Sequence, residues 1–175
     1  AVASVGNPAR GLAGPSLAPG DNPVDTFIPV ARIADLLLNP GGTLDFDGST
    51  ITYPGIRLVY WCGGNVFHHH QDLNRLLAAW QRPETIIVHE PWWNPMARHA
   101  DIVLPCTTTL ERNDLGCSFR DNFMFAMQQA VPPVADSRND FDIFSGVAAR
   151  LGFGDAFTEG RSEEAWLRYL YNQFR

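Results

Sequence analysis

The first part of the chain changes from a helical to a strand-like spacing of apolar residues. From Val30 to Leu38 the apolar side chains recur at helical spacing, which predicts a helix ended by the Asn-Pro-Gly sequence that follows. Thr43–Phe46 and Ser49–Tyr53 alternate around the dipeptide Asp47-Gly48. Because an Asp-Gly pair readily adopts the positive φ angles of a type I′ turn, this pattern predicts a small β-hairpin.

A different pattern follows, in which apolar runs alternate with segments of helical periodicity. The strand-length runs are Ile56–Cys62, Thr85–His89 and Asp101–Leu104. Between them, His68–Trp80 has one apolar helical face, and Met96–Ala100 can hold a short helix. This alternation predicts a parallel sheet with right-handed crossovers. The expected fold class is α/β, a Rossmann-like domain with a parallel sheet, a small β-hairpin and an extended N-terminal segment.

The two ends of the chain differ in composition. Residues 1–26 are rich in glycine and proline and lack apolar periodicity, so they are expected to be extended without a core of their own. A disordered tail is the alternative for this segment. Beyond the sheet, Phe123–Val131 is expected to form a strand, and Asn139–Leu151 and Ser162–Phe174 to form helices. Residues 27–175 are therefore interpreted as one α/β domain.

Composition and charge exclude several classes of function. The net charge of −6 disfavours binding to a nucleic-acid backbone. No apolar run approaches the ~20 residues of a membrane-spanning helix. All 13 basic residues are arginine, so neither a P-loop nor a Schiff-base mechanism can be complete here, since each needs a lysine. Cys62, Cys106 and Cys117 lack the spacing of a disulfide framework or a thiolate metal site.

Polar residues gather where the predicted parallel strands end. Ligands of open parallel sheets bind beyond the carboxyl ends of the strands, so the segments that follow the strands form the candidate site. These segments contain Gly63, Gly64, Asn65, His89, Glu90, Thr107, Thr108, Thr109, Glu111 and Arg112. Paired glycines let a backbone approach a pyrophosphate, and an acid after the next strand can bind ribose hydroxyls. A plain strand-to-helix turn is an alternative explanation of the glycines.

Two further features leave alternatives open. His68, His69 and His70 are consecutive, whereas helical zinc ligands are spaced i, i+4. Donation to a phosphate or ribose suits these histidines better than metal binding, and for His68 and His70 capping or packing is equally consistent. Asp142 lies in the first turn of a predicted helix, where it could accept hydrogen bonds from the Watson–Crick edge of guanine or simply interact with the helix dipole. No nucleophile–base pair stands out.

Three segments resemble one known family. A close resemblance to the dimethyl sulfoxide reductase family of molybdenum enzymes, in its biotin sulfoxide reductase and trimethylamine-N-oxide reductase branch, is carried by IRLVYWCGGNVFHHHQDLNRLLAAWQRPETIIVHEPWW, RHADIVLPCTTTLERND and NDFDIFSGVAARLG. The resemblance runs from about Phe27 to Gly152. The chain departs from the family pattern at Val66, where proline is expected, and at Cys106, where alanine is expected.

The resemblance implies a cofactor and a set of contacts. Family members bind molybdenum through two molybdopterin guanine dinucleotides, and residues 27–175 would hold one of them as part of a larger multidomain enzyme. The implied cofactor-binding residues are Asn65, His69, His89, Glu90, Arg112 and Asp142. In this branch a serine ligates the molybdenum, and no motif that matches its site is present. The chain therefore resembles an internal fragment, with no catalytic residue or metal ligand expected in it.

The same resemblance implies a reaction and its partners. The full-length protein is expected to reduce an S-oxide or N-oxide, such as biotin or methionine sulfoxide, dimethyl sulfoxide or trimethylamine N-oxide, by oxygen-atom transfer to molybdenum. An electron donor protein or reductant is then required. A cytoplasmic location is expected, or a periplasmic one if a twin-Arg signal precedes the chain. The alternatives are a Rossmann-like domain that binds a nicotinamide or flavin dinucleotide, and a non-catalytic remnant.

Overall fold

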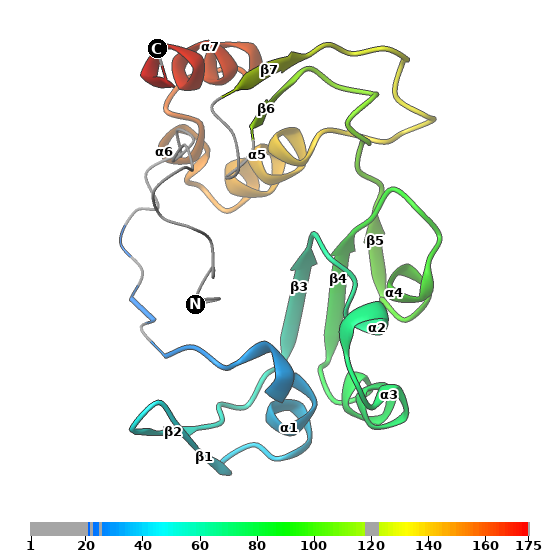
Figure 1. Cartoon of the computed structure of the whole chain (residues 1–175), viewed down its shortest axis with the longest axis vertical. Helices are drawn as coiled ribbons and strands as arrows, with labels where there is room; N and C mark the ends of the chain where they lie inside the picture. The colour runs from blue at the N-terminus through cyan, green and yellow to red at the C-terminus, as the bar shows by residue number, and fades with distance from the viewer. Residues whose placement is uncertain (1–20, 22, 25, 118–122, 175) are drawn as a thin grey trace. The chain divides into compact units, whose positions relative to one another are not determined.

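The computed structural model describes residues 21, 23–24, 26–117 and 123–174 (Figure 1). The predicted extended segment at 1–26 therefore lies almost entirely outside the described residues. The contacts group the chain into two compact units, one ending at Leu104 and the other running on from Pro105. We call residues 21–104 the sheet unit and residues 105–174 the C-terminal unit. The interpretation of residues 27–175 as one cofactor-binding domain stays a prediction.

A parallel three-stranded sheet forms the centre of the sheet unit, as the apolar runs predict. The strands β3 (Leu58–Cys62), β4 (Thr85–His89) and β5 (Ile102–Leu104) lie in that order and run parallel. Figure 1 shows their carboxyl ends at the same edge of the sheet. The crossover between β4 and β5 contains the short helix α4 (Pro95–Arg98), where a helix is predicted.

The helix predicted at His68–Trp80 is wrong in its boundaries, because the structure has two helices there. The first, α2 (Val66–His69), begins two residues early, and the second is α3 (Leu73–Trp80). The chain is extended at His70, with a ψ of 148°, and the Asp72 side chain then accepts a hydrogen bond from the Arg75 backbone. The apolar periodicity indicates the face that the two helices share. It does not show the aspartate cap at which the second helix begins.

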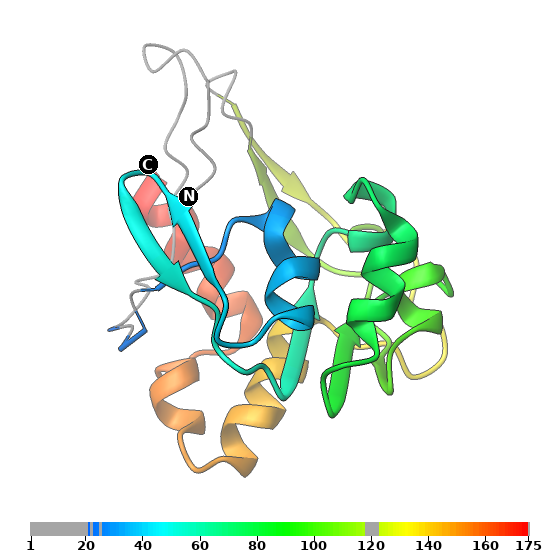
Figure 2. The same ribbon diagram turned by 90° about the horizontal axis from the view of Figure 1, so that it is seen from below.

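The N-terminal part of the sheet unit confirms the predicted hairpin. A 3₁₀ turn, η1 (Val30–Arg32), leads into α1 (Ile33–Leu38), and β1 (Thr43–Phe46) then pairs antiparallel with β2 (Ser49–Thr52). The connecting Asp47-Gly48 pair has φ angles of 48° and 75°, as a type I′ turn requires. Figure 2 shows this hairpin in cyan beside the blue α1.

Apolar side chains from the helices and the sheet form the core of the sheet unit. The largest fully buried side chains are those of Trp80, Leu76, Met96, Val66 and Val88. They belong to one cluster that joins α2, α3 and α4 to the central strand β4. This packing fixes the positions of the loops at the carboxyl edge of the sheet.

The C-terminal unit combines a two-stranded antiparallel sheet with three helices among its described residues. The elements are β6 (Asp114–Cys117), β7 (Met124–Met127), α5 (Asp140–Arg150), α6 (Gly154–Thr158) and α7 (Glu163–Phe174). The predicted strand at Phe123–Val131 is shorter in the structure, because the backbone N–H groups of Ala130 and Val131 donate to the Leu110 carbonyl instead of to a strand. The strand β6 and the helix α6 were not predicted.

Candidate functional site

The carboxyl edge of the parallel sheet brings three of the expected site residues together. Cys62 pairs with His89, and His89 pairs with Leu104, so the three strands end at the same level. The segment that contains Asn65 follows β3, and Glu90 follows β4 directly. Asn65, His89 and Glu90 therefore share one edge of the sheet unit, as expected for a parallel sheet. The polar positions predicted to follow the third strand, from Thr107 to Arg112, belong to the C-terminal unit.

Asn65 is buried and has an unsatisfied amide group. Only 8% of the residue is exposed, and its Oδ1 caps α2 by accepting a hydrogen bond of 3.0 Å from the Phe67 backbone. The buried Nδ2 has no hydrogen-bond partner among the described residues. An unpaired buried donor costs about 1–3 kcal/mol, so an acceptor atom brought to this group would be stabilising. Contact of Asn65 with a cofactor stays a prediction.

The two glycines before Asn65 present their backbone openly. Gly63 and Gly64 have φ angles of 75° and 67°, which favour glycine over other residues. At the position a Cβ atom would occupy on either glycine, the described structure has no atom within 4 Å apart from those of the glycine and its two chain neighbours. The indole N–H of Trp61 donates to the Gly63 carbonyl over 2.8 Å and steadies the turn. A ligand can therefore approach this backbone closely.

His89 is the last residue of the central strand β4, and Glu90 follows it at the carboxyl edge of the sheet. His89 is only 5% exposed, and its Nε2 lies 2.8 Å from the Tyr60 hydroxyl oxygen. Glu90 is half-buried, and its carboxylate accepts a hydrogen bond of 3.3 Å from the Trp92 backbone. Both residues thus have protein partners, and their contact with a cofactor stays a prediction.

The three histidines differ in their surroundings. His69, the position implied by the resemblance, is the exposed last residue of α2. His70 is half-buried, and its buried Nε2 has no hydrogen-bond partner in the described chain. Burial lowers the pKa of His70 and favours the neutral ring. The sequence could not distinguish the surroundings of His69 and His70, because it does not show that the helix ends between them.

Glu111 organises the loop at the start of the C-terminal unit. Its Oε2 accepts hydrogen bonds from the backbone N–H and hydroxyl of Thr108 at 2.7 and 2.8 Å, and its Oε1 accepts one of 2.8 Å from the Val134 backbone. The hydrogen bonds, first that from the Thr108 backbone, hold the pKa of Glu111 below its usual value. Both carboxylate oxygens thus bind groups of the protein, so Glu111 stabilises the loop and is not directed at a ligand.

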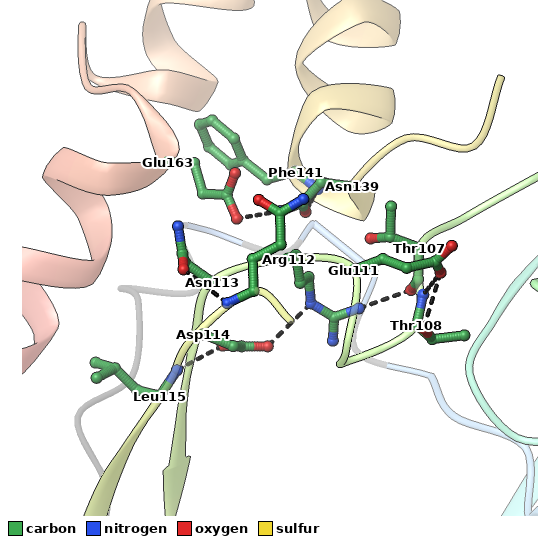
Figure 3. Close-up of polar contacts among 11 residues, drawn as sticks. Thr107, Thr108, Glu111, Arg112, Asn113, Asp114, Leu115, Asn139, Phe141 and Glu163 are labelled. Carbon is green, nitrogen blue, oxygen red and sulfur yellow. Dashed lines mark hydrogen bonds and ion pairs between the residues drawn. The ribbon is translucent and has the colours of Figure 1, made fainter. Parts of the chain in front are cut away.

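Arg112 lies beside Glu111 and is held on two sides (Figure 3). Its Nε donates to Asp114 over 3.0 Å, and a terminal nitrogen donates to the Thr107 carbonyl over 2.7 Å. Thr107 itself is 4% exposed, and its buried hydroxyl oxygen has no hydrogen-bond partner within the described ranges. A fixed guanidinium and an unsatisfied hydroxyl therefore come from one loop.

Asp142 and Arg112 both lie near Glu163, the first residue of α7. Asp142 is exposed in the first turn of α5, two residues past the start of the helix. Burial first, and then the negative charges of Asp142 and Asp114, raise the pKa of Glu163, against a lowering by Arg112 and by a hydrogen bond from Asn139. Sequence reasoning assigned no site role to Glu163.

The expected cofactor-binding residues thus fall into two groups. Asn65, His69, His89 and Glu90 belong to the sheet unit, and Arg112 and Asp142 belong to the C-terminal unit. In the described parts of the chain, no three His, Cys, Asp or Glu side chains are grouped to hold a metal ion. No helix within those parts is long and apolar enough to cross a membrane.

The chain belongs to the molybdopterin oxidoreductase family, whose family model matches residues 5–150. This finding agrees with the resemblance carried by the glycine-asparagine turn and the strand ends. The family is thereby established for the chain. The solved structure of acetylene hydratase from Pelobacter acetylenicus has a similar fold, with a TM-score of 0.60 and 18% identity over 73% of this chain and 16% of that one.

Several relatives are much more similar in sequence. Biotin sulfoxide reductase of Cereibacter sphaeroides is 52% identical over 99% of this chain and 23% of its own length. Dimethyl sulfoxide/trimethylamine N-oxide reductase of the same organism is 51% identical over 83% of this chain and 18% of its own. Trimethylamine-N-oxide reductase of Haemophilus influenzae is 49% identical over 87% and 19%. The chain spans about a fifth of the length of these relatives.

Proposed function

We propose that this chain is the part of a molybdenum S-oxide or N-oxide reductase that holds one guanine dinucleotide half of a bis(molybdopterin guanine dinucleotide) cofactor. Membership of the molybdopterin oxidoreductase family supports the pterin cofactor, and the reductases similar to this chain support the class of reaction. The Rossmann-like dinucleotide-binding role and the guanine form of the cofactor are part of this proposal. When bound, the molybdenum supplies two-electron oxygen-atom-transfer chemistry.

The unsatisfied amide of Asn65 is the observation that carries the proposal. A buried N–H donor next to two open glycines suits the oxygen-rich pyrophosphate of a dinucleotide, which offers acceptors and tolerates close backbone approach. The amide would donate to a phosphate or pterin oxygen while its own oxygen keeps the cap on α2. The residues present therefore fit the group.

The remaining contacts follow from the chemistry of each side chain. Glu90 would accept hydrogen bonds from hydroxyl groups, and Arg112 would offer the guanidinium nitrogens that Asp114 and Thr107 leave to an acceptor. Asp142, exposed on α5, would accept hydrogen bonds from N1–H and the amino group of guanine. His69 and His89 would donate from ring nitrogens. These roles serve binding and orientation.

The substrate and the location belong to the whole protein. We propose biotin sulfoxide, dimethyl sulfoxide and trimethylamine N-oxide as the substrates to test, since enzymes similar to the chain carry these names. Methionine sulfoxide is a further S-oxide to test on the same chemistry. An electron donor protein or reductant would complete the reaction. We propose a cytoplasmic location, with export through a twin-Arg signal as the alternative.

Cofactor content of the full-length polypeptide tests the proposal directly. The polypeptide that contains this chain, purified from cells supplied with molybdate, should hold about one molybdenum and release about two GMP per molecule on acid treatment. Bound flavin or nicotinamide would instead support the alternative dinucleotide class. A polypeptide with neither molybdenum nor GMP would contradict the proposal and favour a non-catalytic remnant.

A pair of asparagine variants tests the residue that carries the proposal. Asn65→Ala removes a helix cap and the unsatisfied amide, whereas Asn94→Ala removes only the comparable cap of α4, which accepts a hydrogen bond from the Ala97 backbone. Each lost cap costs about 1 kcal/mol. The two variants should therefore lose similar stability. Only Asn65→Ala also loses a hydrogen bond to the ligand, so molybdenum and GMP content should fall about tenfold in Asn65→Ala and stay near wild type in Asn94→Ala. Equal content in both variants would remove Asn65 from the site.

A further inference from the structure

Glu163 joins the first turn of α7 to the first turn of α5. The Asn139 side chain donates from Nδ2 to the Glu163 carboxylate, and its Oδ1 accepts a hydrogen bond of 2.8 Å from the Phe141 backbone (Figure 3). Asn139 is thus the cap of α5 and is held at both ends of its amide. With an acceptor on one side, the amide must present its oxygen to the helix.

We propose that Glu163 is a positioning residue for guanine recognition: by fixing the Asn139 cap, it sets the first turn of α5 and hence the place of the Asp142 carboxylate. The inference rests on the proposed function, in which Asp142 binds the guanine edge. Asp142 lies three residues after Asn139, so the orientation of the cap is transmitted to it within one turn of helix.

The charges around Glu163 favour a base over a phosphate at this place. The negative charges of Asp142 on α5 and Asp114 on β6 act on Glu163, and so does the positive charge of Arg112. Two of the three Arg112 guanidinium nitrogens already donate within the protein, to Asp114 and to the Thr107 carbonyl. A surplus of carboxylate suits the neutral N–H donors of guanine and repels a phosphate dianion.

The neighbouring glutamate provides a matched control. Glu164 lies in the same helical turn but is exposed, and it pairs with Arg168 one turn further along α7. An exposed pair of this kind contributes little to stability. Glu164→Ala therefore changes the same helix, charge and residue type without touching the Asn139 cap.

Binding of nucleosides tests the inference. The full-length polypeptide, purified free of cofactor, is titrated calorimetrically with guanosine and with adenosine. Glu163→Ala, and Glu163→Met as a variant that retains side-chain length, should lower the preference for guanosine about tenfold, as for a misplaced charge-assisted hydrogen bond. Glu163→Gln keeps an acceptor oxygen for Asn139 and should restore the preference. Glu164→Ala should leave it unchanged.

The outcomes separate this inference from the proposed function. A wild-type preference for guanosine that survives in both Glu163→Ala and Glu163→Met overturns the positioning role alone, and so does failure of Glu163→Gln to restore it. Equal weakening of guanosine and adenosine would indicate a general structural effect and also overturns the role. A wild-type polypeptide without any guanosine preference overturns the guanine site itself, and with it the inference.

Discussion

At the scale of single residues, the Glu111 carboxylate makes the fold sensitive to acid. Its hydrogen bonds to Thr108 and Val134 lower the pKa of Glu111 below the ordinary glutamate value of 4.5. A carboxyl whose pKa is lower in the folded state contributes stability above the unfolded-state pKa and loses it as pH falls through the folded-state pKa. We therefore expect this loop to lose stability below about pH 4.5, with the loss complete only below the folded-state pKa.

Amide hydrogen exchange measures this effect locally. In Glu111→Gln the Thr108 and Val134 amides should exchange faster than in wild type at pH 7. This difference in exchange rate should shrink as pH falls toward and below 4.5. Glu164→Gln, which alters an exposed pair, should not change these amides. A difference that is constant across this pH range would show that the charge of Glu111 does not stabilise the loop.

The positions of the candidate site residues could be predicted where they follow from the local sequence. Asn65 and Glu90 follow strands whose apolar runs are visible in the sequence, so their place at one edge of the sheet could be inferred. Glu163 could not, because its hydrogen bond to Asn139 joins residues 24 positions apart on two helices. In the sequence it shows only the acidic character common to the first turn of a helix. Likewise, nothing in the sequence distinguishes the unsatisfied hydroxyl of Thr107 from its neighbouring threonines.

At the scale of elements, the turn between β3 and α2 should tolerate substitution less than the hairpin turn does. Gly64 and Gly48 have similar φ angles of 67° and 75°, and a Cβ atom on either would meet open space among the described residues. Alanine should therefore add a similar backbone strain of about 1 kcal/mol at each position. Of the two, only Gly64 lies at the carboxyl edge of the parallel sheet. There the added methyl group would keep the proposed dinucleotide from approaching the backbone.

Cofactor content distinguishes the two glycines. Gly64→Ala should lower the molybdenum and GMP content of the full-length polypeptide several-fold, and Gly48→Ala should leave it near wild type. Thermal melting of both variants checks that their losses of stability are comparable. If Gly48→Ala loses as much cofactor as Gly64→Ala, backbone strain alone explains the effect, and the turn has no direct contact with the dinucleotide.

The elements could be predicted where a single factor, such as burial in a parallel sheet, determines the apolar pattern. Buried parallel strands need continuous apolar runs, and β4, with its predicted bounds Thr85–His89, was found as predicted. The break between α2 and α3 was missed because the Asp72 cap competes with a periodicity that continues across it. All residues of β6 and β7 are exposed or half-buried, so no burial pattern marks β6 in the sequence.

At the scale of the whole molecule, the core of the sheet unit should determine whether its carboxyl edge is formed. Leu76 and Leu77 are neighbours on α3, but Leu76 is fully buried, whereas Leu77 is 39% exposed. Leu76→Ala leaves a cavity in the cluster that joins the helices to β4 and should cost about 2–5 kcal/mol. Leu77→Ala removes a similar side chain from a partly solvated place and should cost about 1 kcal/mol or less.

Hydrogen exchange followed element by element tests this dependence. In Leu76→Ala, amides of β3, β4 and α3 should exchange at least ~30-fold faster than in wild type, as expected for a loss of about 2 kcal/mol or more, and cofactor content should fall with them. Leu77→Ala should change both much less. Because the two variants share the helix and the residue type, only burial separates them. Equal effects would mean that helix propensity, and not the core behind β4, holds the site's edge in place.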